Sequence, residues 1–251
     1  MSADPVATCA AADAFFHLRA YAALGIATEE ADGLWWAVTA GSPVFCTGGS
    51  AGRHASAGRM LTAFADRTDP IRIRDCWAGL DLAAAGFSAE PDDPWMLRPA
   101  GRIAIDAAPG LRIAAVADAR DVVTFERTVI AATGKTPSGH VDGAIHPGPA
   151  TVADRAFALF VGYLDDEPVA TSLAAIAPEA SSIGAVAVCA RARRRGIGAA
   201  MTAAAVASAP DRPATLLASD PGFGVYSSLG FRVVGRGVTW RRPARPSVAE
   251  W

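Results

Sequence analysis

The chain has 251 residues, of which 51% are hydrophobic, and a formal net charge of −2. This length is enough to bury a substantial core in one large domain or two small ones. The near-neutral charge argues against a nucleic-acid partner, because a protein that neutralises phosphates needs a concentrated basic face.

The four cysteines are far apart in the sequence and include no C-x-x-C pair. Their spacing predicts neither a zinc site nor a disulfide framework, and a reduced, cytoplasmic compartment fits best. The first residues lack the basic and apolar regions of a signal peptide, and no apolar stretch approaches the ~20 residues of a membrane span. We therefore expect no membrane association.

In the first part of the chain, apolar periodicity and turn residues predict a succession of short helices and strands. Helices are expected at 7–25, 57–65 and 80–85, the last ended by Gly86, and strands at 34–39, 44–47, 71–74 and 95–98. The glycine-rich segment 48–52 reads as a turn.

Residues 99–110 are rich in Ala, Gly and Pro and are the predicted linker. After it, the pattern predicts a strand at 111–117 and a helix at 119–133. Three strands are expected between 157 and 188, separated by turns at 165–168 and 178–181, as in an antiparallel meander.

Residues 186–198 carry the most informative pattern in the chain. A β-branched strand at 186–188 runs into a basic turn with two glycines, and an alanine-rich helix follows until Pro210 ends it. The first N–H groups of a helix are unpaired and its N-terminus is partially positive, so an anion is stabilised there. Gly196 and Gly198 allow phosphate oxygens to approach the backbone.

The hexapeptide Arg193-Arg-Arg-Gly-Ile-Gly198 matches the [RQ]-x-x-G-x-[GA] signature of the GNAT superfamily of N-acetyltransferases. Tyr226-Ser-Ser-Leu-Gly-Phe231 follows at the distance where these enzymes carry Tyr-x-x-x-Gly-Phe, and 216–219 reads as the strand between the two motifs. The chain from about 111 to 242 thus resembles this family, whose members bind the pyrophosphate of acetyl-CoA on such a loop.

The resemblance implies a binding site and a mechanism. The pyrophosphate would lie on the backbone of 194–199, and the strand 186–188 would pair with the pantetheine amides. Tyr226 would protonate the departing thiolate, and Glu179 is the candidate base that deprotonates the acceptor amine. The implied acetyl-CoA site comprises Val186, Ala187, Val188, Arg193, Arg194, Arg195, Gly196, Ile197, Gly198, Ala199 and Ser219, with no metal.

An internal repeat extends this reading to the whole chain. Leu82-Ala-Ala-Ala-Gly86-Phe87, followed by the segment 95–99, is similar to Tyr226-Ser-Ser-Leu-Gly-Phe231, followed by 240–243. The repeat predicts an α/β (α+β) tandem GNAT-like fold, with a mixed central sheet flanked by helices. We expect a degenerate N-terminal domain at 1–108, without donor loop or phenol, and a catalytic domain at 109–251.

Three rival motifs are less well supported. Gly48-Gly-Ser50-Ala-Gly52 has the form of a nucleophile elbow, but too little chain precedes Ser50 for an α/β-hydrolase sheet. Gly134-Lys-Thr136 ends like a nucleotide-binding P-loop but lacks its first glycine. His140, Asp142 and His146 could bind a metal, yet polar residues in a Gly/Pro-rich loop are far more often solvated.

These observations predict an acetyl-CoA-dependent N-acetyltransferase that transfers the acetyl group directly, in a ternary complex, to an amine of a small molecule or peptide. The alternative is a non-catalytic acyl-CoA-binding sensor or scaffold. The identity of the amine, the length of the acyl group and the oligomeric state, a homodimer included, stay open.

Overall fold

The computed structural model describes residues 4–90, 93–106, 108–137, 140–146 and 148–245. Its helices are α1 (Pro5–Ala23), α2 (Ala57–Ala63), α3 (Ala119–Thr133), α4 (Gly148–Ala153), α5 (Ile197–Val206) and α6 (Asp220–Ser228), with 3-10 turns η1 (Ala83–Ala85) and η2 (Ala190–Ala192). Its strands are β1 (Thr28–Ala31), β2 (Leu34–Ala37), β3 (Gly48–Ser50), β4 (Ile71–Asp75), β5 (Ser88–Ala89), β6 (Asp93–Arg98), β7 (Arg112–Ala115), β8 (Phe157–Leu164), β9 (Glu167–Ile176), β10 (Ser181–Val188), β11 (Ala214–Leu217) and β12 (Arg232–Arg242).

The strands form one mixed sheet, in the order β1-β2-β3-β4-β12-β6-β11-β10-β9-β8-β7. From β1 to β8 this order is symmetric about the β12–β6 pair. The pair β3–β4 is parallel, as is β10–β11, and each is followed by an antiparallel neighbour. The topology therefore supports the internal repeat and the predicted α/β class.

The repeat also appears in the local backbone that precedes β6 and β12. Gly86 follows η1 with φ +83°, and Gly230 follows α6 with φ +86°. In both places the chain reverses in a left-handed conformation that glycine adopts without a steric penalty. Each reversal directs the chain towards the sheet of the other half: β6 pairs with β11, and β12 with β4.

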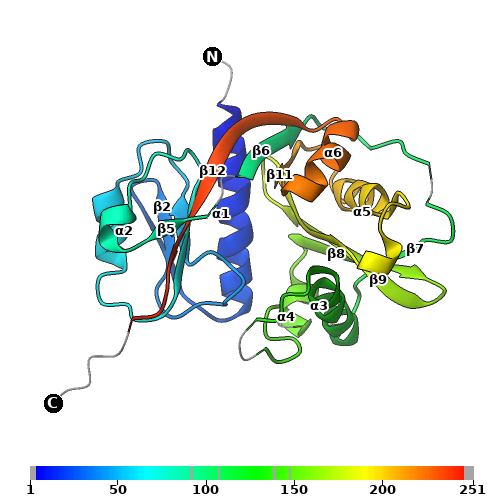
Figure 1. Cartoon of the computed structure of the whole chain (residues 1–251), viewed down its shortest axis with the longest axis horizontal. Helices are drawn as coiled ribbons and strands as arrows, with labels where there is room; N and C mark the ends of the chain where they lie inside the picture. Colours follow the sequence, from blue (N-terminus) through cyan, green and yellow to red (C-terminus); the bar gives the residue numbers. More distant parts are fainter. Residues whose placement is uncertain (1–3, 91–92, 107, 138–139, 147, 246–251) are drawn as a thin grey trace.

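Helices cover both faces of the sheet in the C-terminal half (Figure 1). Successive residues of β9 point to opposite faces, so Leu173 packs with Phe125 of α3 while Ala174 packs with Ala205 of α5. Helix α1 lies between the two halves in Figure 1 and contacts β6, β9 and β10. Its Phe16 joins the cluster around Phe125, so α1 and α3 share one face.

Most of the predicted elements are present, but the segment 44–50 corrects the prediction. Residues 44–47 form bends, and the strand begins at Gly48, in the glycine-rich segment expected to be a turn. The reason is the large side chain of Trp35 on the neighbouring strand. A Cβ on Gly49 would lie 2.7 Å from Trp35 Nε1, so the glycines make room for the indole. The sequence pattern also missed β1, β5 and α4.

The predicted boundary between 108 and 109 stays a prediction, because β6 comes before it in the chain and yet lies between β11 and β12. Within the described part of the chain, no helix is both long enough and apolar enough to cross a membrane.

Candidate functional site

An opening between β10 and β11 lies at the centre of the C-terminal half. The two strands pair at Ser181 and Ser182, and in the described structure this pairing does not continue to 186–188. On the other side of β10, the register with β9 skips from Gly184 to Ala187. Ala185, within this bulge, has φ +49°, and its carbonyl accepts a hydrogen bond of 2.7 Å from the Thr171 hydroxyl. The edge of 186–188 is therefore left for another partner.

The loop from β10 to α5 is shaped by two residues in the left-handed region, Arg194 (φ +60°) and Gly196 (φ +76°). Arg193 fixes the loop, since its guanidinium donates to the carbonyl oxygens of Val188 (3.0 Å) and Ala132 (2.9 Å). Arg194 and Arg195 are exposed. Arg193 therefore ties the loop to the end of β10 and to α3.

The start of α5 fits a pyrophosphate. The first backbone N–H with a helical partner is that of Ala200, which donates to the Gly196 carbonyl. The N–H groups of Ile197, Gly198 and Ala199 precede it, as unpaired groups at a helix N-terminus do. A Cβ on Gly198 would come no closer than 3.8 Å to Val188, so this glycine leaves open the space beside these groups.

Tyr226 lies on α6, which follows β11, and it belongs to the same buried cluster as Ile183 of β10. Its ring is buried in the cluster with Leu216 and packs edge-on against Phe231, with the ring centroids 6.1 Å apart. Burial raises the pKa of its phenol, which keeps the group protonated at neutral pH. Ser219 caps the N-terminus of α6 and is exposed.

Glu179, the predicted base, is exposed in the turn between β9 and β10. It is not part of the lining of the main cavity described below. Its role stays a prediction.

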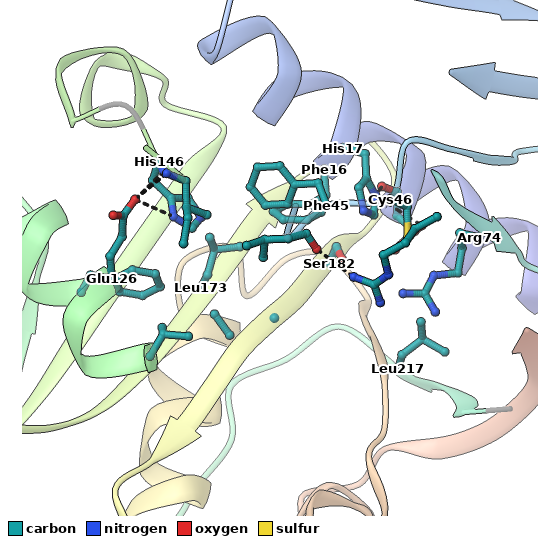
Figure 2. Close-up of a pocket in the computed structure, with 18 of the residues that line it drawn as sticks. Phe16, His17, Phe45, Cys46, Arg74, Glu126, His146, Leu173, Ser182 and Leu217 are labelled. Carbon is teal, nitrogen blue, oxygen red and sulfur yellow. Dashed lines mark hydrogen bonds and ion pairs between the residues drawn. The ribbon is translucent and has the colours of Figure 1, made fainter. Parts of the chain in front are cut away.

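A cavity of about 330 Å³ lies between the two halves and reaches the bulge of β10 (Figure 2). Ser182, Gly184 and Ala185 of β10 form one wall of it. The rest is largely apolar and comes from α1, α3, β4, β6, β9, β11 and the segments 44–46 and 145–146: Phe16, Val44, Phe45, Trp95, Phe125, Val129, Ile145, Leu173 and Leu217, with the polar residues Asp13, His17, Cys46, Arg72, Arg74, Glu126 and His146. A cavity of this kind is a typical ligand site.

Glu126 has a structural role at one end of this cavity. Its carboxylate accepts hydrogen bonds from the backbone N–H groups of Gly143 (2.7 Å) and Ile145 (3.1 Å), and also from that of His146. Burial opposes its charge, but these bonds hold its pKa below the usual value. Glu126 thus fixes the loop that follows α3 against the cavity.

Sequence reasoning missed the polar group at the opposite end, formed by Asp13, His17, Cys46 and Arg74. Asp13 and His17 are one helical turn apart on α1, a spacing that brings side chains together. No sequence signal places Cys46 beside them. Among the described residues, no cluster of His, Cys, Asp or Glu has the arrangement of a metal site, and Asp142 pairs with Arg127 instead.

Residues 129–231 match the model of the acetyltransferase (GNAT) family. No curated protein matched.

Solved structures resemble nearly the whole chain. A GCN5-related N-acetyltransferase from Kribbella flavida has a TM-score of 0.67 at 19% identity, covering 93% of this chain and 95% of its own. A conserved protein of unknown function from Staphylococcus epidermidis has a TM-score of 0.62 at 12% identity, covering 88% and 95%. A GCN5-related N-acetyltransferase-like protein from Streptococcus suis has a TM-score of 0.52 at 13% identity, covering 89% and 92%. At these identities the likeness shows the fold, including its two halves.

Proposed function

From the GNAT domain at 129–231, we propose that the protein transfers an acetyl group from acetyl-CoA to an amine of a small molecule or peptide, directly and in a ternary complex. One observation carries the proposal. The opening between β10 and β11 has a helix N-terminus suited to an anion at one end and the bulge of β10, beside a largely apolar cavity, at the other.

The parts of this opening have separate tasks. The N–H groups of 197–199 bind the pyrophosphate, while the free edge of 186–188 pairs with the pantetheine amides. The thioester then lies at the bulge, where the amine attacks the carbonyl carbon from the cavity. The C–S bond breaks, and the Tyr226 phenol gives its proton to the leaving thiolate.

The apolar walls of the cavity favour an acceptor that has an apolar body beside its amine. Phe16, Phe45 and Leu173 exclude water from the thioester, which limits wasteful hydrolysis. Because 1–108 lacks a second basic donor loop, each chain should bind one acetyl-CoA.

The test incubates the protein with acetyl-CoA and a broad panel of amines, measures the release of free thiol, and identifies acetylated products by mass spectrometry. Amine-dependent thiol release supports the proposal. Tight binding of acetyl-CoA with no turnover on any amine would favour the sensor instead.

A further inference from the structure

Three side chains from two segments of the N-terminal half meet at the cavity wall. Asp13 and His17 on α1 and Cys46 in the bend before β3 are 7%, 4% and 2% exposed. His17 Nδ1 lies 2.8 Å from the Asp13 carbonyl oxygen and 3.5 Å from Asp13 Oδ2. The side chain of Cys46 interacts with the same imidazole.

Packing fixes this acid–imidazole–thiol arrangement. The His17 ring stacks on Trp35, with centroids 5.0 Å apart and an interplanar angle of 25°. The Tyr21 hydroxyl donates a 3.0 Å hydrogen bond to the Cys46 carbonyl oxygen, which holds the cysteine backbone in place. A thiol beside an imidazole that a third group orients is the usual form of an activated nucleophile.

The surrounding charges favour the ionised pair. Burial opposes both charges, yet Asp13 and the bond to Cys46 raise the pKa of His17 to about 10. Arg74, followed by His17, holds the pKa of Cys46 below its ordinary value. At Cys9 burial is not outweighed by nearby positive charges, and the pKa of its thiol is raised to about 12.

Cys46 lies in the cavity where the proposed function places the thioester, so the thioester is the electrophile with which its sulfur would react. Cys46 lines the same cavity as Gly184 and Ala185 of the β10 bulge, where the proposed function puts the thioester (Figure 2). Cys46 itself is 2% exposed and lies beside the charged groups of Asp13, His17 and Arg74, while the wall between it and the bulge includes the apolar side chains of Phe16 and Phe45. A small acyl group in this cavity is thus accessible both to an incoming amine and to Cys46.

We propose that Cys46 is a self-acylation site, whose sulfur takes the acetyl group of a bound acetyl thioester when no amine occupies the cavity. The Cys46 thiolate attacks the thioester carbonyl, a new C–S bond forms, and the bond to the CoA sulfur breaks. CoA leaves as a thiol after it accepts a proton from Tyr226, which regains one from solvent. An amine bound in the cavity separates Cys46 from the thioester and suppresses the reaction.

This inference rests on the proposed function for the donor, so the experiment uses two donors. The full chain is incubated without amine, either with acetyl-CoA or with S-acetyl-N-acetylcysteamine, a thioester that does not need the pyrophosphate loop. Intact mass and peptide mapping then locate any added acetyl group. Cys46→Ala is the test variant, and Cys76→Ala is the matched control, because burial raises the pKa of Cys76 well above its ordinary value.

We expect one acetyl group on Cys46 in the wild type and in Cys76→Ala, and none in Cys46→Ala. Labelling by the short thioester but not by acetyl-CoA would sustain the nucleophile and count against the proposed CoA site. Labelling by neither, or equal labelling of several cysteines, would overturn the inference.

A second measurement on the wild type does not depend on the folding of a variant. At pH 7, iodoacetamide should alkylate Cys46 at least about tenfold faster than Cys9 or Cys76, because the thiolate is the reactive form. A rate at Cys46 no higher than at those two cysteines would also overturn the proposal.

Discussion

Replacing Tyr226 with Phe separates catalysis from binding. Among the described residues the phenol has no hydrogen-bond partner, while its ring packs against Phe231 and Leu216. Removing the hydroxyl therefore keeps the packing, and the free energy of unfolding should change by less than about 1 kcal/mol. If the phenol is the acid that protonates the thiolate, kcat should fall by ~10²-fold or more, equivalent to about 2.7 kcal/mol in the activation barrier.

The assay measures thiol release in a single turnover, with saturating acetyl-CoA and the best amine from the panel, so that product release does not hide the chemical step. Calorimetry on the same samples should give a Kd for acetyl-CoA within a few-fold of the wild type, since the proton is donated only as the thiolate leaves. An unchanged single-turnover rate would refute the acid role and leave Tyr226 as a packing residue.

Four further outcomes follow. In Gly222→Ala the new Cβ would lie 2.6 Å from the Tyr226 ring, so the ring must move. We expect kcat to fall while calorimetry shows that acetyl-CoA affinity is maintained. An unaltered kcat would contradict the importance of the position of the Tyr226 ring. Gly198→Val should leave the melting temperature near the wild-type value, because a Cβ has room there. The substitution should weaken acetyl-CoA binding at least about tenfold, because the valine side chain covers the N–H groups of the α5 N-terminus. Normal affinity would contradict a pyrophosphate site at the start of α5. Titration should saturate at one acetyl-CoA per chain, and two equivalent sites would overturn the degenerate first half. For pH, the folded-state pKa of His17 is raised to about 10, so its stabilising contribution is complete below pH 6.5 and is lost as pH rises through 10. The pKa of Cys46 is lowered from 9.0, so its contribution is complete above pH 9.0 and is lost as pH falls through the folded pKa. Between the folded pKa of Cys46 and pH 9.0 the two slopes oppose each other in the wild type, so its free energy of unfolding should depend weakly on pH there, while that of Cys46→Ser should fall by up to about 1.4 kcal/mol per pH unit; equal slopes in denaturant titrations would contradict the ion pair.

Local patterns predicted the parts of the fold that depend on neighbours in the sequence. The strand, basic turn and helix at 186–206, and the turns at Gly86 and Gly230, follow from residues next to one another. The strand at 48–50 could not be predicted in this way, because its glycines are required by the bulk of Trp35 on the adjacent strand.

The same distinction applies to the candidate site. The donor side lies on one continuous stretch and was visible as a motif. The group formed by Asp13, His17 and Cys46 exists because the segment before β3 packs against α1, and it is held there by Trp35 and Tyr21. Cysteine spacing, the signal used to interpret Cys46, carries no information about such a contact.

Each half of the chain contributes one strand to the sheet of the other half, since β6 pairs with β11 and β12 pairs with β4. Neither half can therefore complete its sheet alone. During synthesis, β4 remains a sheet edge until β12, which is made more than 150 residues later, is available to cover it. Conversely, β11 depends on a strand made long before it. Such distant pairings are slow to form, and an uncovered edge invites association with other chains. Deletion of the first half would therefore leave the second half without β6, the strand that pairs with β11 and so supports one side of the opening between β10 and β11.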